Sequence, residues 1–150
     1  MSENTIFDEL RADHDTQRTL MDLLEKTEGD SEGRRELFGR FKRALRAHAA
    51  AEERVFYRAL LDHGMTQERA RHSMKEHAEA DELLEDLENR PMDDPGWLPT
   101  LRKLVEANRH HVDEEEEEVF PLAGRVLDGD AQRRMASRFR RLEEEEREAA

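Results

Sequence analysis

One set of residues occurs twice in this chain, at a fixed distance along the sequence. The set is a single His followed later by a His-x-x-x-Glu pair, and it recurs 63 positions on: His14, His48 and Glu52, then His77, His111 and Glu115. Residues four apart lie one turn apart on the same face of a helix, so each pair directs two donor atoms at one place. The repeat therefore predicts two similar helical halves that face each other across a common centre.

The spacing of the whole set carries this prediction, because the His-x-x-x-Glu pair alone is weak. Glu is so frequent that four of the seven His have a Glu four positions on. The two extra pairs are His72 with Glu76 and His110 with Glu114, and neither recurs when it is moved by 63 positions. We expect His72, Glu76, His110 and Asn108 to be candidates for orienting a ligand rather than ligands themselves.

Apolar residues at helical spacing predict four long helices, over about residues 4–28, 33–62, 66–89 and 97–127. Thr66 is expected to be an N-cap, Gly64 a C-terminal cap, and Pro121 to kink or loosen the last turns. Short connections predict an all-α, up-down-up-down four-helix bundle over residues 1–128. Residues 129–150 are expected to form a C-terminal helix, with Asp130 as its N-cap, that packs on the bundle or another subunit or remains a solvated tail.

Composition narrows the classes of partner and metal ligand. The net charge of −13 disfavours binding to nucleic acid or to anionic membranes. The chain has no Cys, so any metal must be held by nitrogen and oxygen atoms. No apolar stretch approaches the ~20 residues that span a bilayer, and the first residues lack an apolar segment. We expect a cytoplasmic protein.

Six inward-facing donors need a cation. A buried carboxylate without a partner is costly, and here two carboxylates meet four imidazoles. Imidazole with carboxylate suits iron, manganese or zinc, and six ligands exceed what one tetrahedral zinc ion uses. We therefore expect two ions bridged by Glu52 and Glu115, with His14 and His48 on one and His77 and His111 on the other. An oxo or hydroxo bridge would complete the set.

Four stretches resemble the hemerythrin family, specifically its bacterial HHE cation-binding domains: ADH at residues 12–14, HAAAEERVFY at 48–57, EH at 76–77 and HVDEEEEEVFP at 111–121. The resemblance spans roughly residues 6–127. It implies a non-haem di-iron centre in a four-helix bundle. The respiratory members have a fifth His one turn before the residue matching His77, where this chain has Ser73, so the resemblance favours an open position on each metal over reversible oxygen carriage.

The resemblance favours a protein that binds or reacts with O2, peroxide or NO, in oxygen sensing or in protection against oxidative or nitrosative stress. A catalase-like di-iron enzyme and a non-catalytic iron store or sensor remain alternatives. Whether the chain is an enzyme, and its oligomeric state, stay open. Simple helical winding places Tyr57 about 180° from His48, which predicts that Tyr57 only packs against other aromatic residues.

Overall fold

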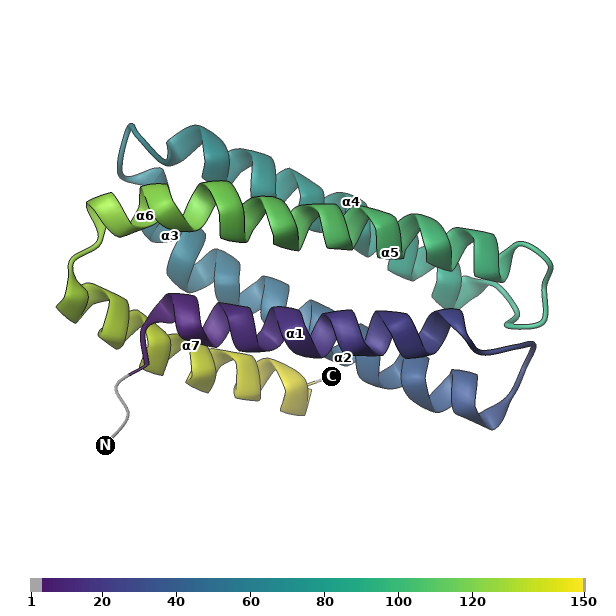
Figure 1. Ribbon diagram of the computed structural model, residues 1–150. Helices are drawn as coiled ribbons and strands as arrows, with labels where there is room; N and C mark the ends of the chain where they lie inside the picture. The colour runs from purple at the N-terminus through teal and green to yellow at the C-terminus, as the bar shows by residue number, and fades with distance from the viewer. Residues whose placement is uncertain (1–3, 150) are drawn as a thin grey trace.

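The computed structural model describes residues 4–149, and these residues form five helical rods with no strand among them (Figure 1). The outermost residues of the two expected segments, 1–3 and 150, lie outside the described part. Two of the rods contain an internal π-helical turn, so each of these two is labelled as an α-helix, a π turn (η) and a second α-helix. The rods are α1 (Ile6–Glu25), α2–η1–α3 (Glu32–Glu52, Glu53–Tyr57, Arg58–Leu61), α4 (Gln67–Asn89), α5–η2–α6 (Trp97–Glu114, Glu115–Val119, Phe120–Val126) and α7 (Gly129–Ala149).

Local capping fixes where the first two rods begin. The Thr5 hydroxyl accepts from the Asp8 amide while the Asp8 carboxylate accepts from the Thr5 amide, which is a capping box. The Ser31 hydroxyl caps α2 by accepting from the Arg34 amide at 3.1 Å. Gly29 has φ of 57°, a conformation that L side chains rarely adopt, so it allows the turn between α1 and α2.

Two of the three expected caps are wrong. Thr66 does stand at the N-cap position of α4, but its hydroxyl makes no capping hydrogen bond and donates instead to the Leu60 carbonyl at 2.8 Å. Gly64 does not take the left-handed conformation expected of a C-terminal cap. Asp128, rather than Asp130, accepts from the Ala131 amide at 2.8 Å and so caps α7. These two errors displace a helix end by only one or two residues, because several polar residues stand close together at these ends.

The first four rods run up and down beside one another, and α7 lies along α1 and α2 (Figure 1). The interior has two apolar clusters. One, at the end where α1 begins, includes Ile6, Leu10, Phe56, Leu60 and Phe139. The other, at the opposite end, includes Met21, Leu24, Phe41, Trp97 and Leu101. Buried His, Glu, Gln and Asn side chains occupy the level between the two clusters.

A π-helical turn interrupts both long rods, and the two turns are within one residue of the same place in the repeat. The turn η1 begins directly after Glu52, and η2 begins at Glu115. Pro121, which was expected to disturb the second rod, follows η2 within α6. The matching position in the first half is Arg58, and that half has its π turn without a proline. Proline is therefore not required for the interruption, which accompanies the glutamate of each half.

The helix α7 is not a solvated tail. It buries Met135, Ala136 and Phe139, and Phe139 joins the apolar cluster that includes Phe56. None of the helices formed by residues 4–149 combines the length and the apolar character needed to cross a membrane.

Candidate metal centre

The structure brings all six predicted residues together in the polar level of the bundle. Five separations between their donor atoms are short: His14 Nε2–Glu115 Oε1 3.1 Å, His48 Nε2–Glu52 Oε1 3.3 Å, His77 Nε2–Glu52 Oε1 3.2 Å, His77 Nε2–His111 Nε2 3.1 Å and His111 Nε2–Glu115 Oε2 3.8 Å. Glu52 therefore touches one His of each expected pair, and so does Glu115. This is the arrangement that two bridging carboxylates would have.

A carboxylate holds the outer nitrogen of every imidazole. The four contacts are His14 Nδ1–Glu116 2.7 Å, His48 Nδ1–Asp13 2.7 Å, His77 Nδ1–Glu53 3.2 Å and His111 Nδ1–Glu76 2.8 Å. In each case Nδ1–H donates to the carboxylate, which leaves the Nε2 lone pair facing the centre. Such partners fix the orientation and tautomer of a metal-binding imidazole and raise its basicity.

Sequence reasoning identified one of these four carboxylates and missed three. Glu76 was a candidate for orienting a ligand, whereas Asp13, Glu53 and Glu116 were not. The sequence does contain a signal for these carboxylates. The 63-residue shift that relates the two sets of candidate ligands also relates Asp13 to Glu76 and Glu53 to Glu116. Asn108 was also a candidate, but it donates to Gln17 at 3.0 Å instead of to an imidazole.

Several buried polar atoms at the centre have no hydrogen-bond partner within residues 4–149. They are His14 Nε2, His48 Nε2, both oxygens of Glu52 and Glu115 Oε1. A buried polar atom without a partner costs about 1–3 kcal/mol, and more when it is charged. Five such atoms that face one another indicate a group that the protein atoms alone do not supply.

The electrostatics of the metal-free centre show the same need for a cation. Burial would lower the pKa of His77, but the neighbouring Glu52 and Glu53 raise it to about 9. Burial likewise opposes ionisation of His14, yet Glu115 and Glu116 raise its pKa. Without a metal, protonated imidazoles therefore supply positive charge to the carboxylates.

The pKa values of the two central carboxylates, Glu52 and Glu115, are shifted in opposite directions. Burial alone would raise the pKa of Glu52, but the positive charge of His48 holds it well below the usual range. Burial and the negative charge of Glu52 raise the pKa of Glu115. Two carboxylates this close are not easily both ionised, and a dication between them would remove the conflict.

Tyr57 does more than pack, contrary to the expectation from winding. Its ring lies 5.3 Å from the ring of His77, and its hydroxyl donates to Glu115 Oε2. Burial and the charges of Glu115 and Glu52 hold the pKa of Tyr57 well above its usual value, although the nearby Ser73 opposes this shift, so the phenol remains a donor. A π turn adds a residue to the helix and rotates the residues after it by about 100°, which turns Tyr57 inward.

The helix α7 covers the half of the centre that contains His48. The ring of Phe139 lies 5.6 Å from that of His48. Glu143 Oε2 lies 3.9 Å from His48 Nδ1, and Glu143 is only 7% exposed although it begins the acidic run at residues 143–146. Burial and the neighbouring Asp13 raise the pKa of Glu143 to about 8. The neutral acid can therefore lie beside the Asp13 carboxylate.

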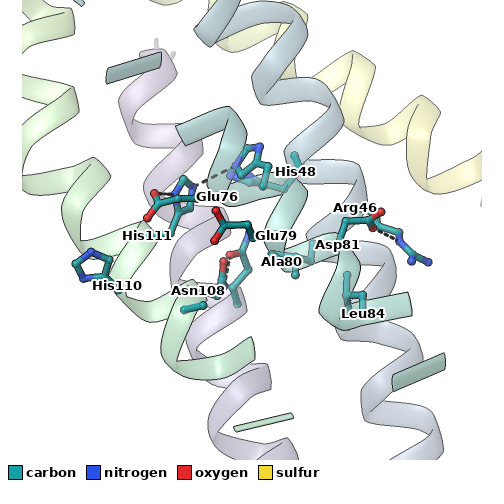
Figure 2. A pocket seen from close by; sticks show the side chains of 15 residues that line it. Arg46, His48, Glu76, Glu79, Ala80, Asp81, Leu84, Asn108, His110 and His111 are labelled. Atoms are coloured by element: carbon teal, nitrogen blue, oxygen red, sulfur yellow. Dashed lines mark hydrogen bonds and ion pairs between the residues drawn. The ribbon is translucent and has the colours of Figure 1, made fainter. Parts of the chain in front are cut away.

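A cavity of about 260 Å³ adjoins the centre on the side away from α7 (Figure 2). Three of the candidate ligands line it: His48, His77 and His111. Its other walls include apolar residues such as Leu45, Ala80 and Leu84 and the amides of Gln17 and Asn108. Gln17 is buried and its Nε2 has no partner within residues 4–149. Small molecules therefore have room beside the candidate metal ligands.

The geometry fits a pair of metal ions. Ligand atoms that bind one ion at about 2.1 Å lie about 3.0 Å apart in octahedral geometry and about 3.4 Å apart in tetrahedral geometry. The observed separations of 3.1, 3.2 and 3.3 Å fall in this range. Two groups of ligand atoms lie within reach of a single ion each, one formed by His14, His48, Glu52 and Glu115 and the other by Glu52, His77 and His111.

Comparison with known proteins gives three similarities. Residues 5–123 match the Hemerythrin HHE cation binding domain family. The crystal structure of a hemerythrin HHE cation binding domain-containing protein from Mycobacterium kansasii superimposes with a TM-score of 0.87, at 21% identity over 99% of this chain and 90% of that one. A Nostoc protein described as a DNA nickase is 30% identical over 138 residues, which are 90% of this chain but span only 38% of that protein.

Proposed function

Because the chain belongs to the hemerythrin HHE cation-binding domain family, we propose that its centre holds two iron ions and binds or reacts with O2, hydrogen peroxide or NO. The ligands would be the six residues of the repeat: His14, His48, His77, His111, Glu52 and Glu115. Zn²⁺ or Mn²⁺ could replace iron in the same set of donors. The five buried, unpartnered polar atoms that face one another carry this proposal.

Each ion would take the two histidines of one group. His14 and His48 would hold one ion, His77 and His111 the other, and Glu52 and Glu115 would be shared between them. Bound iron supplies the capacity to coordinate and to reduce or oxidise a small molecule. The protein supplies the rest: four carboxylates fix the imidazoles, and Tyr57 orients Glu115.

The cavity favours a function in small-molecule chemistry. It leads to His77 and His111 and is large enough for O2, peroxide or NO together with water. Ser73 stands where respiratory members have a fifth His, so no fifth imidazole competes at that place in the ligand set, and Ser73 bonds instead to Tyr57. These features support sensing of small oxidants or protection against them over reversible oxygen carriage.

Two alternatives remain within the same proposal. A catalase-like enzyme would use the same cavity, and only sustained turnover would distinguish it from a protein that reacts once. A store is disfavoured because the six ligands provide for only two ions per chain. A sensor would require metal occupancy or oxidation to change a surface, and α7, which contacts His48 through Phe139, is the element best placed to do so.

The test uses ferrous protein prepared without oxygen. O2, hydrogen peroxide and NO are each added in turn, and absorption in the near ultraviolet and visible range is followed in a stopped-flow instrument. We expect at least one of the three to change the spectrum in proportion to the iron bound, and His77→Ala to abolish the change. Two bound irons that respond to none of the three molecules would refute the proposed reactivity.

A variant of the cavity tests the route of access. Ala80 lines the cavity and is not itself a candidate ligand, so Ala80→Phe should fill part of the cavity and slow the reaction while the iron content stays at two per chain. The exposed Arg71→Phe is the control and should react at the wild-type rate. Equal rates in Ala80→Phe and wild type would show that small molecules enter elsewhere.

DNA nicking is not part of the proposal. The chain spans only 38% of the Nostoc protein described as a DNA nickase. Its net charge of −13 opposes the phosphate backbone electrostatically.

A further inference from the structure

The two His-x-x-x-Glu pairs outside the repeat meet on the surface. His72 and Glu76 lie on α4, His110 and Glu114 lie on α5, and both pairs are on the outer faces of these neighbouring helices. His72 Nε2 lies 3.4 Å from Glu76 Oε2 and 3.4 Å from Glu114 Oε1. Side chains from two helices thus direct an imidazole and two carboxylates at one point.

The separations match those of ligands on a single ion. Two ligand atoms at about 2.1 Å from a tetrahedral ion lie about 3.4 Å apart, which is the distance from His72 Nε2 to each carboxylate oxygen. The donor atoms of His72, Glu76 and Glu114 all lie within 4.8 Å of one another. An accidental i,i+4 pair accounts for two donors on one helix, whereas here a third donor comes from the neighbouring helix.

We propose that His72, Glu76 and Glu114 form a third metal site, which binds one divalent transition-metal ion such as Zn²⁺ or Fe²⁺. One imidazole and two carboxylates suit ions of this class, and solvent can supply the remaining ligands. The site is open to solvent, since the His72 side chain is 51% exposed. This inference does not depend on what the buried centre binds.

Neighbouring residues hold the two carboxylates in place. His110 Nε2 lies 2.9 Å from Glu114 Oε2, the oxygen that does not face His72. Glu76 Oε1 lies 2.8 Å from His111 Nδ1 (Figure 2). The other oxygen of the same carboxylate, Glu76 Oε2, faces His72. Glu76 therefore connects the surface site with an imidazole of the buried centre. Arg69 Nη1 lies 4.0 Å from Glu114 Oε1, the oxygen that faces His72, but nearer to Glu118, at 3.3 Å, so Glu118 is its main partner.

The experiment compares the number of ions bound by matched variants. Wild type, His72→Ala, Glu114→Gln and His63→Ala are purified and loaded with iron, then titrated with Zn²⁺ in a calorimeter and analysed for total metal. His72 and Glu114 do not touch the ligands of the buried centre, so their loss should leave that centre filled. We expect wild type and the control His63→Ala to bind one ion per chain more than His72→Ala and Glu114→Gln.

A second probe identifies the ligand. Co²⁺ added to the loaded wild type should give visible absorption bands that are lost in His72→Ala. If His72→Ala and Glu114→Gln bind the same number of ions as wild type with the same affinity, the third site does not exist. The test compares the number of ions bound by wild type with the number bound by each variant. Its result therefore does not depend on whether the buried centre holds two irons or reacts with oxidants.

Discussion

At the scale of single residues, the arrangement around the imidazoles suits the candidate centre to metal binding. Each of the four histidines has its outer nitrogen fixed by a carboxylate, and these carboxylates follow the same repeat as the ligands. The ligand nitrogens therefore face the centre before any ion arrives. This preorganisation lowers the cost of ordering the site when metal binds.

Asp13→Asn and Glu76→Gln test that role. Each replaces the carboxylate behind one imidazole with a neutral amide of the same size, so metal affinity should fall about 10–100-fold while the helical structure is retained. Metal affinity is measured by competition with a chelator, and helical content by circular dichroism. Glu79→Gln is the control, because Glu79 lines the cavity without holding a histidine. Affinities equal to that of Glu79→Gln would contradict the assigned role.

Tyr57→Phe tests the bond between Tyr57 and Glu115. A buried hydrogen bond to a charged group is worth about 1.5–3 kcal/mol, so the metal-free variant should lose roughly this much free energy of unfolding. The loss should be smaller in the metal-loaded protein, where an ion neutralises Glu115. Urea denaturation of both forms measures the difference.

The control for Tyr57→Phe is a neutral buried hydroxyl far from the centre. Thr100 donates to the Gly96 carbonyl at 2.8 Å, so Thr100→Val should cost the same free energy with and without metal. If Tyr57→Phe behaved in this way too, Glu115 would not be the group that its hydroxyl stabilises.

The sequence was sufficient to name the six candidate ligands, because an exactly repeated spacing can be recognised without knowing the structure. It was not sufficient for Tyr57, whose direction depends on a π turn. Hydrophobic periodicity cannot reveal such a turn in a short helical stretch, since one added residue changes the pattern by less than a turn. Asp13, Glu53 and Glu116 were predictable from the repeat, but the abundance of acidic residues hid them.

At the scale of elements, the π turns and α7 distinguish this bundle from four regular helices. Both π turns accompany the glutamates, at Glu52 and Glu115, and turn the residues after them. The helices themselves were predicted well, because each is long and strongly periodic. The ends were less predictable, as Gly64 and Asp130 show, since several residues near each end are able to cap. The packing of α7 could not be decided from its amphipathic pattern alone.

Phe139→Ala tests whether α7 is part of the folded unit. Phe139 is 1% exposed and packs on His48. Replacing a buried Phe with Ala costs about 3–5 kcal/mol, so thermal and urea unfolding should show a large loss, with weaker retention of the ion held by His14 and His48. The exposed Arg138→Ala on the same helix should change little. Equal stability of the two variants would mean that α7 is not firmly packed in solution.

At the scale of the whole molecule, the bundle places a polar level between two apolar clusters. The clusters supply the hydrophobic stabilisation and hold the rods in register, while the unpartnered atoms of the polar level are suited to holding a cation. The surroundings do not follow the twofold repeat, because α7 packs mainly against the half that contains His48, and the cavity is lined by both His77 and His111 but by only His48 of the other pair. The two proposed ions are therefore equivalent in ligand type but not in surroundings.

Anomalous diffraction at the iron edge from crystals of the iron-loaded protein tests the proposed centre most directly. Our account predicts two peaks per chain, about 3.5–4 Å apart or closer, one bound by His14 and His48 and the other by His77 and His111, with Glu52 and Glu115 between them. A single peak, or peaks bound by other residues while these six side chains remain without metal, would contradict it.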